Sequence, residues 1–555
     1  MQKYLRLLLV LVLLPVSSWA AETRPTSAAI ASAHPLATQA GHEILARGGN
    51  AFDAAVAVAA VLAVVEPWNS GLGGGSFFLL HRARDGFDTM IDARERAPLA
   101  ATRDMYLRHG RPVTGLSIDG ALAAGIPGTP AALVHLANKY GKLPLKQTLA
   151  PAIRFARAGF PVTPLYSKTL LRQHMRLTDH FPEAARVYLK EGLIPAPGDM
   201  ARQPALAQTL QRLAEKGHAG FYGDVMAERL VQGVRDAGGN WSLKDLAEYR
   251  VVEREPVRGF YRGVRITSAS LPSSGGVVLV QILNLLQGLD LDAMPKAQRD
   301  HTVITAMRLA YRDRARYLGD PDFVRVDVRH LLDPAYAAKL REEMDQQVSA
   351  PVDSPAKAAG GGANTTHFSI IDREGNRVAA TLSLNTPFGS GFMPPGTGVV
   401  LNNEMDDFSV KPDAPNTYGL VGSDANAIAP GKRPLSSMTP TFLESDETVV
   451  VLGTPGGSRI ISMVLLATLE FSHGRGGPKE WVGLPRFHHQ YLPDVVVHET
   501  GAFNEHETRE LQRFGHRPES VRGRYGNMQV VAWHKKTGKL EAASDPRGEG
   551  AAVVK

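Results

Sequence analysis

The chain has 555 residues, of which 44% are hydrophobic and 21% are charged, and it contains no cysteine. This composition is typical of a folded globular protein and not of a disordered one. The lack of cysteine excludes disulfides, thiolate metal sites, iron–sulfur clusters and a cysteine nucleophile. A net charge of +7 is small for this length and gives little support to a nucleic-acid-binding function.

The first twenty residues have the pattern of a secretory signal peptide. Lys3 and Arg6 precede an apolar run from Leu7 to Val16, and the segment ends in Ser18-Trp19-Ala20. A membrane anchor is the alternative, but the run is shorter than the ~20 apolar residues that a membrane-spanning helix needs. We therefore expect residues 1–20 to be removed and the mature protein to be exported, periplasmic or secreted, without stable membrane insertion.

The next elements are mostly helical. Residues 38–65 predict two helices separated at Gly48-Gly49, and a glycine-rich turn at 70–76 leads into a strand at 77–81. The turn precedes its strand and lacks the Gly-x-Gly-x-x-Gly spacing, so it favours a tight turn beside a substrate pocket over a phosphate loop. Further helices are expected at 131–140, 145–158, 203–216, 277–286 and 300–317.

The composition and hydrophobic pattern of the sequence change near residue 346. A polar segment rich in Pro and Gly, about 346–364, predicts an exposed linker without regular structure. After it the hydrophobic period becomes two, which predicts strands at 366–372 and 377–385 joined by a hairpin turn, with further strands at 448–453 and 528–534. The sequence thus divides into a helix-rich part, 21–364, and a strand-rich part, 365–555.

The junction between these parts carries the chemical signal. Asn364 ends the linker and Thr365 opens a strand, although fold stability does not require a threonine there. A threonine hydroxyl becomes a useful nucleophile when a base lies beside it, and cleavage of the preceding peptide bond would free an α-amine that serves as this base. Taken alone, the Asn-Thr-Thr pattern also fits an N-glycosylation acceptor.

Blocks spread over nearly the whole chain resemble the γ-glutamyltranspeptidases (glutathione hydrolases), which are N-terminal-nucleophile hydrolases. The blocks occur in the order found in that family. They are residues 48–57, 66–75, 92–98, 272–276, 313–321, 401–408, 433–440 and 454–459. The resemblance implies an α/β (α+β) fold, the four-layer αββα sandwich of N-terminal-nucleophile hydrolases, formed jointly by a large chain, 21–364, and a small chain, 365–555, after self-cleavage.

The resemblance also implies roles for individual residues. The cleaved bond would be Asn364–Thr365, Thr365 the nucleophile, Ser383 its hydrogen-bonding partner, and Gly456 and Gly457 the oxyanion hole. Two further sets would hold the α-carbon of the substrate. The α-carboxylate set is Arg94, Ser436 and Ser437, and the α-ammonium set is Asn385, Glu404 and Asp407.

These assignments agree with the chemistry of the residues. Arginine binds a carboxylate in a bidentate manner, and carboxylates suit an ammonium group. Glycines leave backbone N–H groups open to a developing oxyanion. Without the resemblance, Arg94 also fits a surface ion pair, Glu404 and Asp407 a cation site or acidic turn, and the Ser and Gly pairs ordinary turns.

Some positions differ within the family or need separate interpretation. Glu404 stands where some bacterial members have Gln, and Ser383 where many have Thr. Residues 411–420 resemble a loop that covers the pocket in some members, with Tyr418 as its gating residue. His488-His489 suggests a metal, but adjacent strand residues point to opposite faces, so we expect packing. His367 is not expected to be the base for Thr365.

The sequence therefore predicts a self-processed threonine enzyme that cleaves γ-glutamyl amides such as glutathione. A γ-glutamyl-enzyme ester would pass its acyl group to water or to an amino-acid or peptide amine, and the resemblance implies no metal or organic cofactor. The expected partners are these small molecules and the two chains of one precursor, without nucleic acid. One alternative is a cephalosporin (glutaryl) acylase-like enzyme on the same scaffold, and a second is an inactive exported binding protein.

Overall fold

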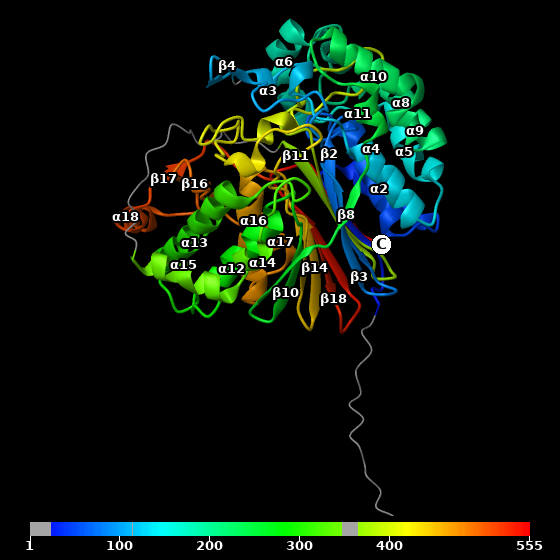
Figure 1. Ribbon diagram of the computed structural model, residues 1–555. Helices are drawn as coiled ribbons and strands as arrows, with labels where there is room; N and C mark the ends of the chain where they lie inside the picture. Colours follow the sequence, from blue (N-terminus) through cyan, green and yellow to red (C-terminus); the bar gives the residue numbers. More distant parts are fainter. Residues whose placement is uncertain (1–23, 114, 347–363) are drawn as a thin grey trace, which may run out of the picture.

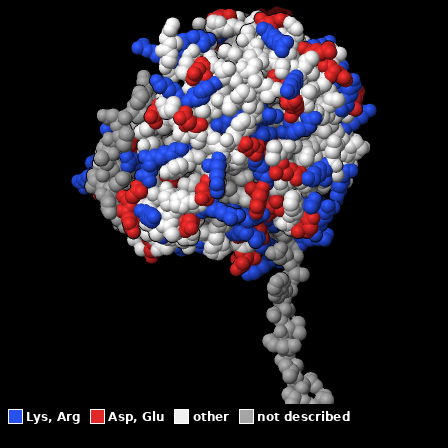
Figure 2. All heavy atoms as spheres, viewed as in Figure 1, with Lys and Arg blue, Asp and Glu red and all other residues white. Residues whose placement is uncertain are grey.

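The computed structural model describes residues 24–113, 115–346 and 364–555 (Figure 1). The predicted signal peptide and nearly all of the predicted linker lie outside these ranges. Among the described residues, no helix is both long and apolar enough to cross a membrane. On the face seen in Figure 2, basic and acidic side chains are intermixed, as expected for a modest net charge.

Two antiparallel sheets form the centre of the molecule. Their strand orders are β20-β1-β11-β12-β2-β3-β8 and β19-β18-β14-β13-β10-β9. In that order, the seven strands of the first sheet are Ala551–Val554, Ala29–Ser32, Thr365–Ile371, Arg377–Ser383, Gly75–Arg82, Phe87–Ala93 and Val252–Arg254. Those of the second are Leu540–Ser544, Gln529–His534, Thr448–Gly453, Thr441–Glu444, Val264–Ser268 and Val257–Tyr261.

Helices cover the outer face of each sheet (Figure 1). The first sheet is covered by a group that includes α1 (Pro35–Ala46), α2 (Ala51–Val65), α4 (Thr129–Lys139), α5 (Leu145–Ala158) and α8 (Pro204–Lys216). The second is covered by α12 (Gly275–Leu286), α13 (Lys296–Tyr317) and α16 (Ile460–Ser472). Because β11 contacts both α2 and the strands β14 and β18, the layers follow the predicted order αββα.

Side chains alternate between the two faces of the first sheet, and they pack into two separate hydrophobic cores. In β2, Phe78 and Leu80 pack toward the helices, whereas Phe77 and Leu79 pack between the sheets. Both faces are apolar, which explains why these strands are continuously hydrophobic. Ile371 of β11 lies in the core between the sheets. Thr365 has the same parity as Ile371, so its side chain is directed toward the second sheet.

The predicted helices and strands are confirmed, with boundaries shifted by a few residues. The helix predicted at 145–158 is α5 without any shift, and the hairpin after the linker is β11 and β12. The expectation of a helical first part was incomplete, because that part also supplies β1, β2, β3, β8, β9 and β10. Both central sheets therefore combine strands from before and after Thr365, so the two parts share one core.

Candidate active site

Strand pairing places Ser383 opposite Thr365. Their positions are partners in the antiparallel ladder of β11 and β12, and the two side-chain oxygens lie 3.1 Å apart. The Ser383 hydroxyl also lies 3.5 Å from the carbonyl oxygen of Asn364 and accepts a hydrogen bond from the Asn385 N–H at 2.8 Å. The hairpin register therefore brings one hydroxyl close to both residues of the Asn364–Thr365 bond.

The glycine-rich turn before β2 packs against this hairpin. A Cβ atom on Gly74 would collide with the carbonyl oxygen of Ser383, and one on Gly73 with that of Val400. A Cβ atom on Gly75 would collide with the Glu95 carboxylate. These close approaches require glycine. The predicted tight turn is therefore confirmed, and it packs against the strand that carries Ser383.

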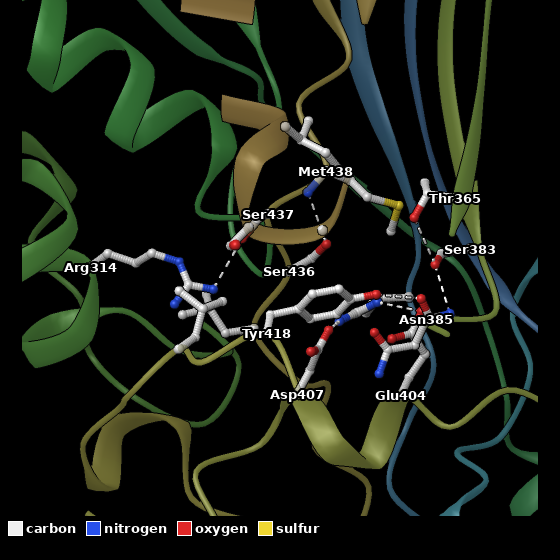
Figure 3. Close-up of a pocket in the computed structure, with 16 residues that line it drawn as sticks. Arg314, Thr365, Ser383, Asn385, Glu404, Asp407, Tyr418, Ser436, Ser437 and Met438 are labelled. Carbon is white, nitrogen blue, oxygen red and sulfur yellow. Dashed lines mark hydrogen bonds and ion pairs between the residues drawn. The ribbon is translucent and has the colours of Figure 1, made fainter. Parts of the chain in front are cut away.

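A pocket opens beside the Thr365 hydroxyl (Figure 3). It gathers ten of the residues that the sequence assigned to the site, from β11, β12 and five later segments of the second part together with Arg94. Those ten are Arg94, Thr365, Ser383, Asn385, Glu404, Asp407, Tyr418, Ser436, Ser437 and Gly457. The free space is about 20 Å³, which is enough for about one water molecule. The side chains that line the pocket therefore nearly fill it.

Arg94 is the centre of a buried charge cluster. Its guanidinium lies 3.0 Å from Glu404 Oε1 and 2.5 Å from Asp407 Oδ2, and its Nε donates to the Pro434 carbonyl at 3.1 Å. Only 1% of the Arg94 side chain is exposed. The alternative of a weak surface ion pair is thus wrong for Arg94, because the group is desolvated and held by three acceptors.

Two carboxyl groups of this cluster are hard to ionise. Burial raises the pKa of Glu95 to about 8, although the nearby charge of Arg94 opposes that shift. Burial also raises the pKa of Glu404 well above its ordinary value, again against the attraction of Arg94. Burial and the neighbouring carboxylates thus disfavour full ionisation of the cluster, and a cation placed beside these groups would favour their ionised forms.

The serine pair lies on the opposite wall, where one residue without a predicted role joins it. Arg314 Nη2 donates to Ser437 Oγ at 3.2 Å, and Arg314 Nε donates to Ser274 Oγ at 2.9 Å. Ser436 is fixed through its carbonyl, which accepts from Ser274 Oγ at 2.7 Å. Arg314 belongs to one of the resemblance blocks, but only the fold brings this second guanidinium to the pocket.

Gly456 and Gly457 form the turn between β14 and α16. Their φ angles are +148° and +58°, a region that favours glycine. Neither N–H donates a hydrogen bond to another residue in the part of the chain that the structure describes. Gly457 lines the pocket, whereas Gly456 lies just outside its lining. The geometry leaves both donors available, as an oxyanion hole needs.

The loop at residues 411–420 lies over the pocket. Its Tyr418 hydroxyl donates to the Asn385 carbonyl at 2.5 Å, and Asn416 Nδ2 donates to Asp407 Oδ1 at 3.1 Å. Figure 3 shows the Tyr418 ring lying across the pocket between Ser436 and the carboxylates of Asp407 and Glu404. The loop is therefore tied to the residues that it covers.

Two predicted site residues, Asn364 and Gly456, do not line the pocket. Asn364 lines a separate, larger cleft on the other side of the Asn364–Thr365 bond. Since Asn364 is bonded to Thr365, the two cavities adjoin at the bond predicted to be cut.

The histidines have structural partners. His367 lies 2.8 Å from Thr381 Oγ1 and 3.2 Å from Ser369 Oγ, and burial lowers its pKa to about 3. His488 contacts Ser462 and Gln490, whereas His489 contacts Asp494. No group of three or more His, Cys, Asp or Glu side chains is arranged to hold a metal among the described residues. The packing interpretation of His488 and His489 is confirmed.

Comparison with solved structures supports the same fold. The chain superposes on the crystal structure of cephalosporin acylase from Bacillus halodurans with a TM-score of 0.84, at 28% identity over 97% of this chain and 98% of that one. Helicobacter pylori gamma-glutamyltranspeptidase gives a TM-score of 0.55 at 41% identity, covering 56% of this chain and 90% of that one.

Comparison with known sequences identifies the family more specifically than the comparison of folds. The glutathione hydrolase proenzyme of Escherichia coli K12 is 42% identical over 525 residues, covering 93% of this chain and 90% of the relative. The proenzyme of Pseudomonas aeruginosa is 38% identical and covers 95% and 94%. The family model of gamma-glutamyltranspeptidase matches residues 37–555. The chain therefore belongs to the γ-glutamyltranspeptidase family.

Proposed function

We propose that this protein is a γ-glutamyltransferase and glutathione hydrolase whose nucleophile is Thr365 after self-cleavage. One observation carries the proposal. The pocket beside the Thr365 hydroxyl presents a buried guanidinium and two serine hydroxyls together with the carboxylates of Glu404 and Asp407. This combination matches the α-carboxylate and α-ammonium that a γ-glutamyl group carries on a single carbon.

Self-cleavage would begin with attack of Thr365 Oγ1 on the carbonyl carbon of Asn364. The C–N bond breaks as a proton passes to the nitrogen, which gives an ester on Thr365 and a free α-amine. Water then hydrolyses the ester, leaving a large chain, 21–364, and a small chain, 365–555. The Ser383 hydroxyl, near both the attacking oxygen and the Asn364 carbonyl, supports this step. Two relatives are named as proenzymes.

The freed α-amine would act as the base in turnover. It accepts the Thr365 hydroxyl proton as the oxygen attacks the γ-carbonyl of the donor. The N–H groups of Gly456 and Gly457 face the oxyanion that develops, and one such donor contributes about 10²–10³ in rate. The amine of the donor leaves with the proton, and water or an acceptor amine then attacks the γ-glutamyl ester.

Recognition of the α-carbon would exchange one set of ion pairs for another. In the closed pocket Arg94 is paired with Glu404 and Asp407. A bound γ-glutamyl group inserts its carboxylate next to Arg94, Ser436 and Ser437 and its ammonium next to the two carboxylates. Every buried charge keeps a partner during this exchange, so the large desolvation cost of an isolated buried charge is avoided.

A glutaryl substrate, as in the acylase alternative, fits this pocket less well. It lacks the α-ammonium and would leave Glu404 and Asp407 without a cationic partner from the substrate. The cephalosporin acylase has a higher TM-score than the Helicobacter pylori gamma-glutamyltranspeptidase. Its sequence identity to this chain is 28%, however, which is below the 42% of the Escherichia coli glutathione hydrolase proenzyme. The inactive-protein alternative is disfavoured because all predicted catalytic positions are filled.

We also propose that the precursor is exported, losing residues 1–20, and that its two chains remain together. The shared central sheets support the second point, since each sheet contains strands from both chains. The chemistry described above uses only groups of the protein, its donor and its acceptor.

A gel of the purified protein, combined with N-terminal sequencing, tests this function. We expect two bands, the smaller beginning at Thr365, together with hydrolysis of γ-glutamyl-p-nitroanilide. Thr365→Ala should give one band and no turnover. An intact chain that hydrolyses this donor would contradict the mechanism, and a processed chain that does not would contradict the substrate assignment.

A further inference from the structure

A second cavity adjoins the scissile bond and has a different chemical character. It encloses about 430 Å³, against about 20 Å³ for the pocket beside Thr365. Its lining includes Asn364 and Pro387, whereas Thr365 and Asn385 line the first pocket. Two short segments, 364–365 and 385–387, thus contribute to both cavities and form the boundary between them.

One wall of this cleft is a face of α6 (Pro164–His180). The residues that line it follow the spacing of one helical face. They are Leu165, Lys168, Thr169, Arg172 and Gln173. The lining also includes the segment 522–527, which contributes Arg522 and Arg524.

Four of these side chains are unneutralised cations. Lys168, Arg172, Arg522 and Arg524 are exposed, and none forms an ion pair or side-chain hydrogen bond with another residue that the structure describes. A fifth cation of the cleft, Arg547, is already paired with Glu499 and Asp545.

The one carboxyl group among the described residues of the lining does little to balance these four positive charges. Glu66 is 1% exposed and accepts a hydrogen bond from the Thr366 hydroxyl at 2.9 Å. The cleft is therefore electropositive, and its positive charges raise the local concentration of anions.

We propose that this cleft binds the carboxylate end of the leaving group and of the acceptor. The proposal rests on the proposed function, because the acyl group must occupy the pocket with Arg94. The amine attached to that acyl group then extends across Thr365 to the side where Asn364 lies. The preferred leaving groups and acceptors are thus amino acids or short peptides with a free C-terminal carboxylate, held by Arg172, Arg524 and their two neighbouring cations.

Two donors that differ in one charge test this inference. Glutathione ends in a carboxylate, and its C-terminal amide has the same γ-glutamyl-cysteinyl-glycyl skeleton without that charge. We expect kcat/KM to be about three- to tenfold higher for glutathione than for its amide, because exposed charge pairs contribute only modestly to binding. The difference should shrink as salt is added, because salt screens exposed charges.

Charge-reversal variants test whether cations of the cleft cause the preference for glutathione over its amide. The double variant Arg172→Glu, Arg524→Glu should lose the preference for glutathione mainly through a higher KM. The matched control Lys146→Glu, Arg229→Glu makes the same change in net charge at exposed positions outside the cleft lining and should keep it. Release of the small chain on a denaturing gel shows that both variants are folded and processed. Turnover of γ-glutamyl-p-nitroanilide, whose leaving group is uncharged, gives the reference value for each variant.

Equal kcat/KM for the two donors in the unmodified protein would overturn the inference while leaving the proposed function intact. Retention of the preference in the cleft variant would do the same. Absence of turnover with all three donors would instead overturn the proposed function.

Discussion

Thr365 and Ser383 are partners across the β11–β12 ladder, with their hydroxyl oxygens 3.1 Å apart. We propose that this contact acts in both self-cleavage and turnover. Replacement of Ser383 with Ala removes one hydrogen bond to a group that gains negative charge during attack. We expect self-cleavage and kcat each to fall about 10- to 100-fold. A time course on a denaturing gel and steady-state kinetics measure the two rates.

Ser383→Thr is the matched control for that experiment. It keeps the hydroxyl at the same ladder position, and threonine suits a strand. Rates close to those of the unmodified protein are expected for this variant. Unimpaired cleavage in Ser383→Ala would show that the contact has no part in the reaction.

A second prediction concerns the carboxylates around Arg94. Asp407→Asn keeps the shape of the side chain and removes one charge that we assign to the substrate ammonium. We expect KM for γ-glutamyl donors to rise about 10- to 100-fold, which corresponds to loss of a charged hydrogen bond. Turnover of a glutaryl amide, which has no ammonium, should not weaken in parallel. An unchanged KM for γ-glutamyl-p-nitroanilide would contradict the assignment.

The hairpin at the nucleophile could be predicted from the sequence because its determinants are local. Alternation with period two defines both strands, and the turn at 373–376 sets their register, so the pairing of Thr365 with Ser383 follows. The burial of α2 could be predicted for a similar reason, since fifteen consecutive residues of Ala, Val, Leu, Phe and Asp offer no polar face.

The charge cluster could not be predicted from local patterns. Arg94 and Asp407 are 313 positions apart, and no periodicity connects a residue after β3 with a short turn in the second part. Only the family resemblance placed them in one site. Family resemblance alone did not identify a role for Arg314, although this residue lies inside a matched block. Its position became clear only in the structure, where the packing of α13 places it beside Ser437.

A third prediction concerns stability against pH. Burial raises the pKa of Glu66 from 4.5 to about 7. Between these values the folded chain holds a proton that the unfolded chain has released, so this group's contribution to stability is present below pH 4.5 and is lost as pH rises through 7. Glu66→Gln cannot ionise, so its free energy of unfolding should fall less over this range, by about 3 kcal/mol.

Denaturant unfolding between pH 4.5 and 8 in a Thr365→Ala background, which keeps the chain in one piece, provides the measurement. Other buried carboxyl groups contribute equally to both proteins, so the difference isolates Glu66. Glu255→Gln, at a side chain that is 84% exposed, is the control and should follow the parent. Parallel curves for Glu66→Gln and its parent would exclude a protonated Glu66.

The last prediction concerns Arg314, whose guanidinium donates to Ser437 Oγ and Ser274 Oγ. Arg314→Met keeps much of the apolar stem but removes both donors and a positive charge beside the proposed carboxylate subsite. We expect KM for γ-glutamyl donors to rise about tenfold, with a smaller change in kcat because Thr365 and Ser383 are untouched. Arg314→Lys keeps the charge without the planar fork and should recover only part of the loss. A larger effect on kcat than on KM would show that Arg314 acts on the reacting atoms and not on substrate binding.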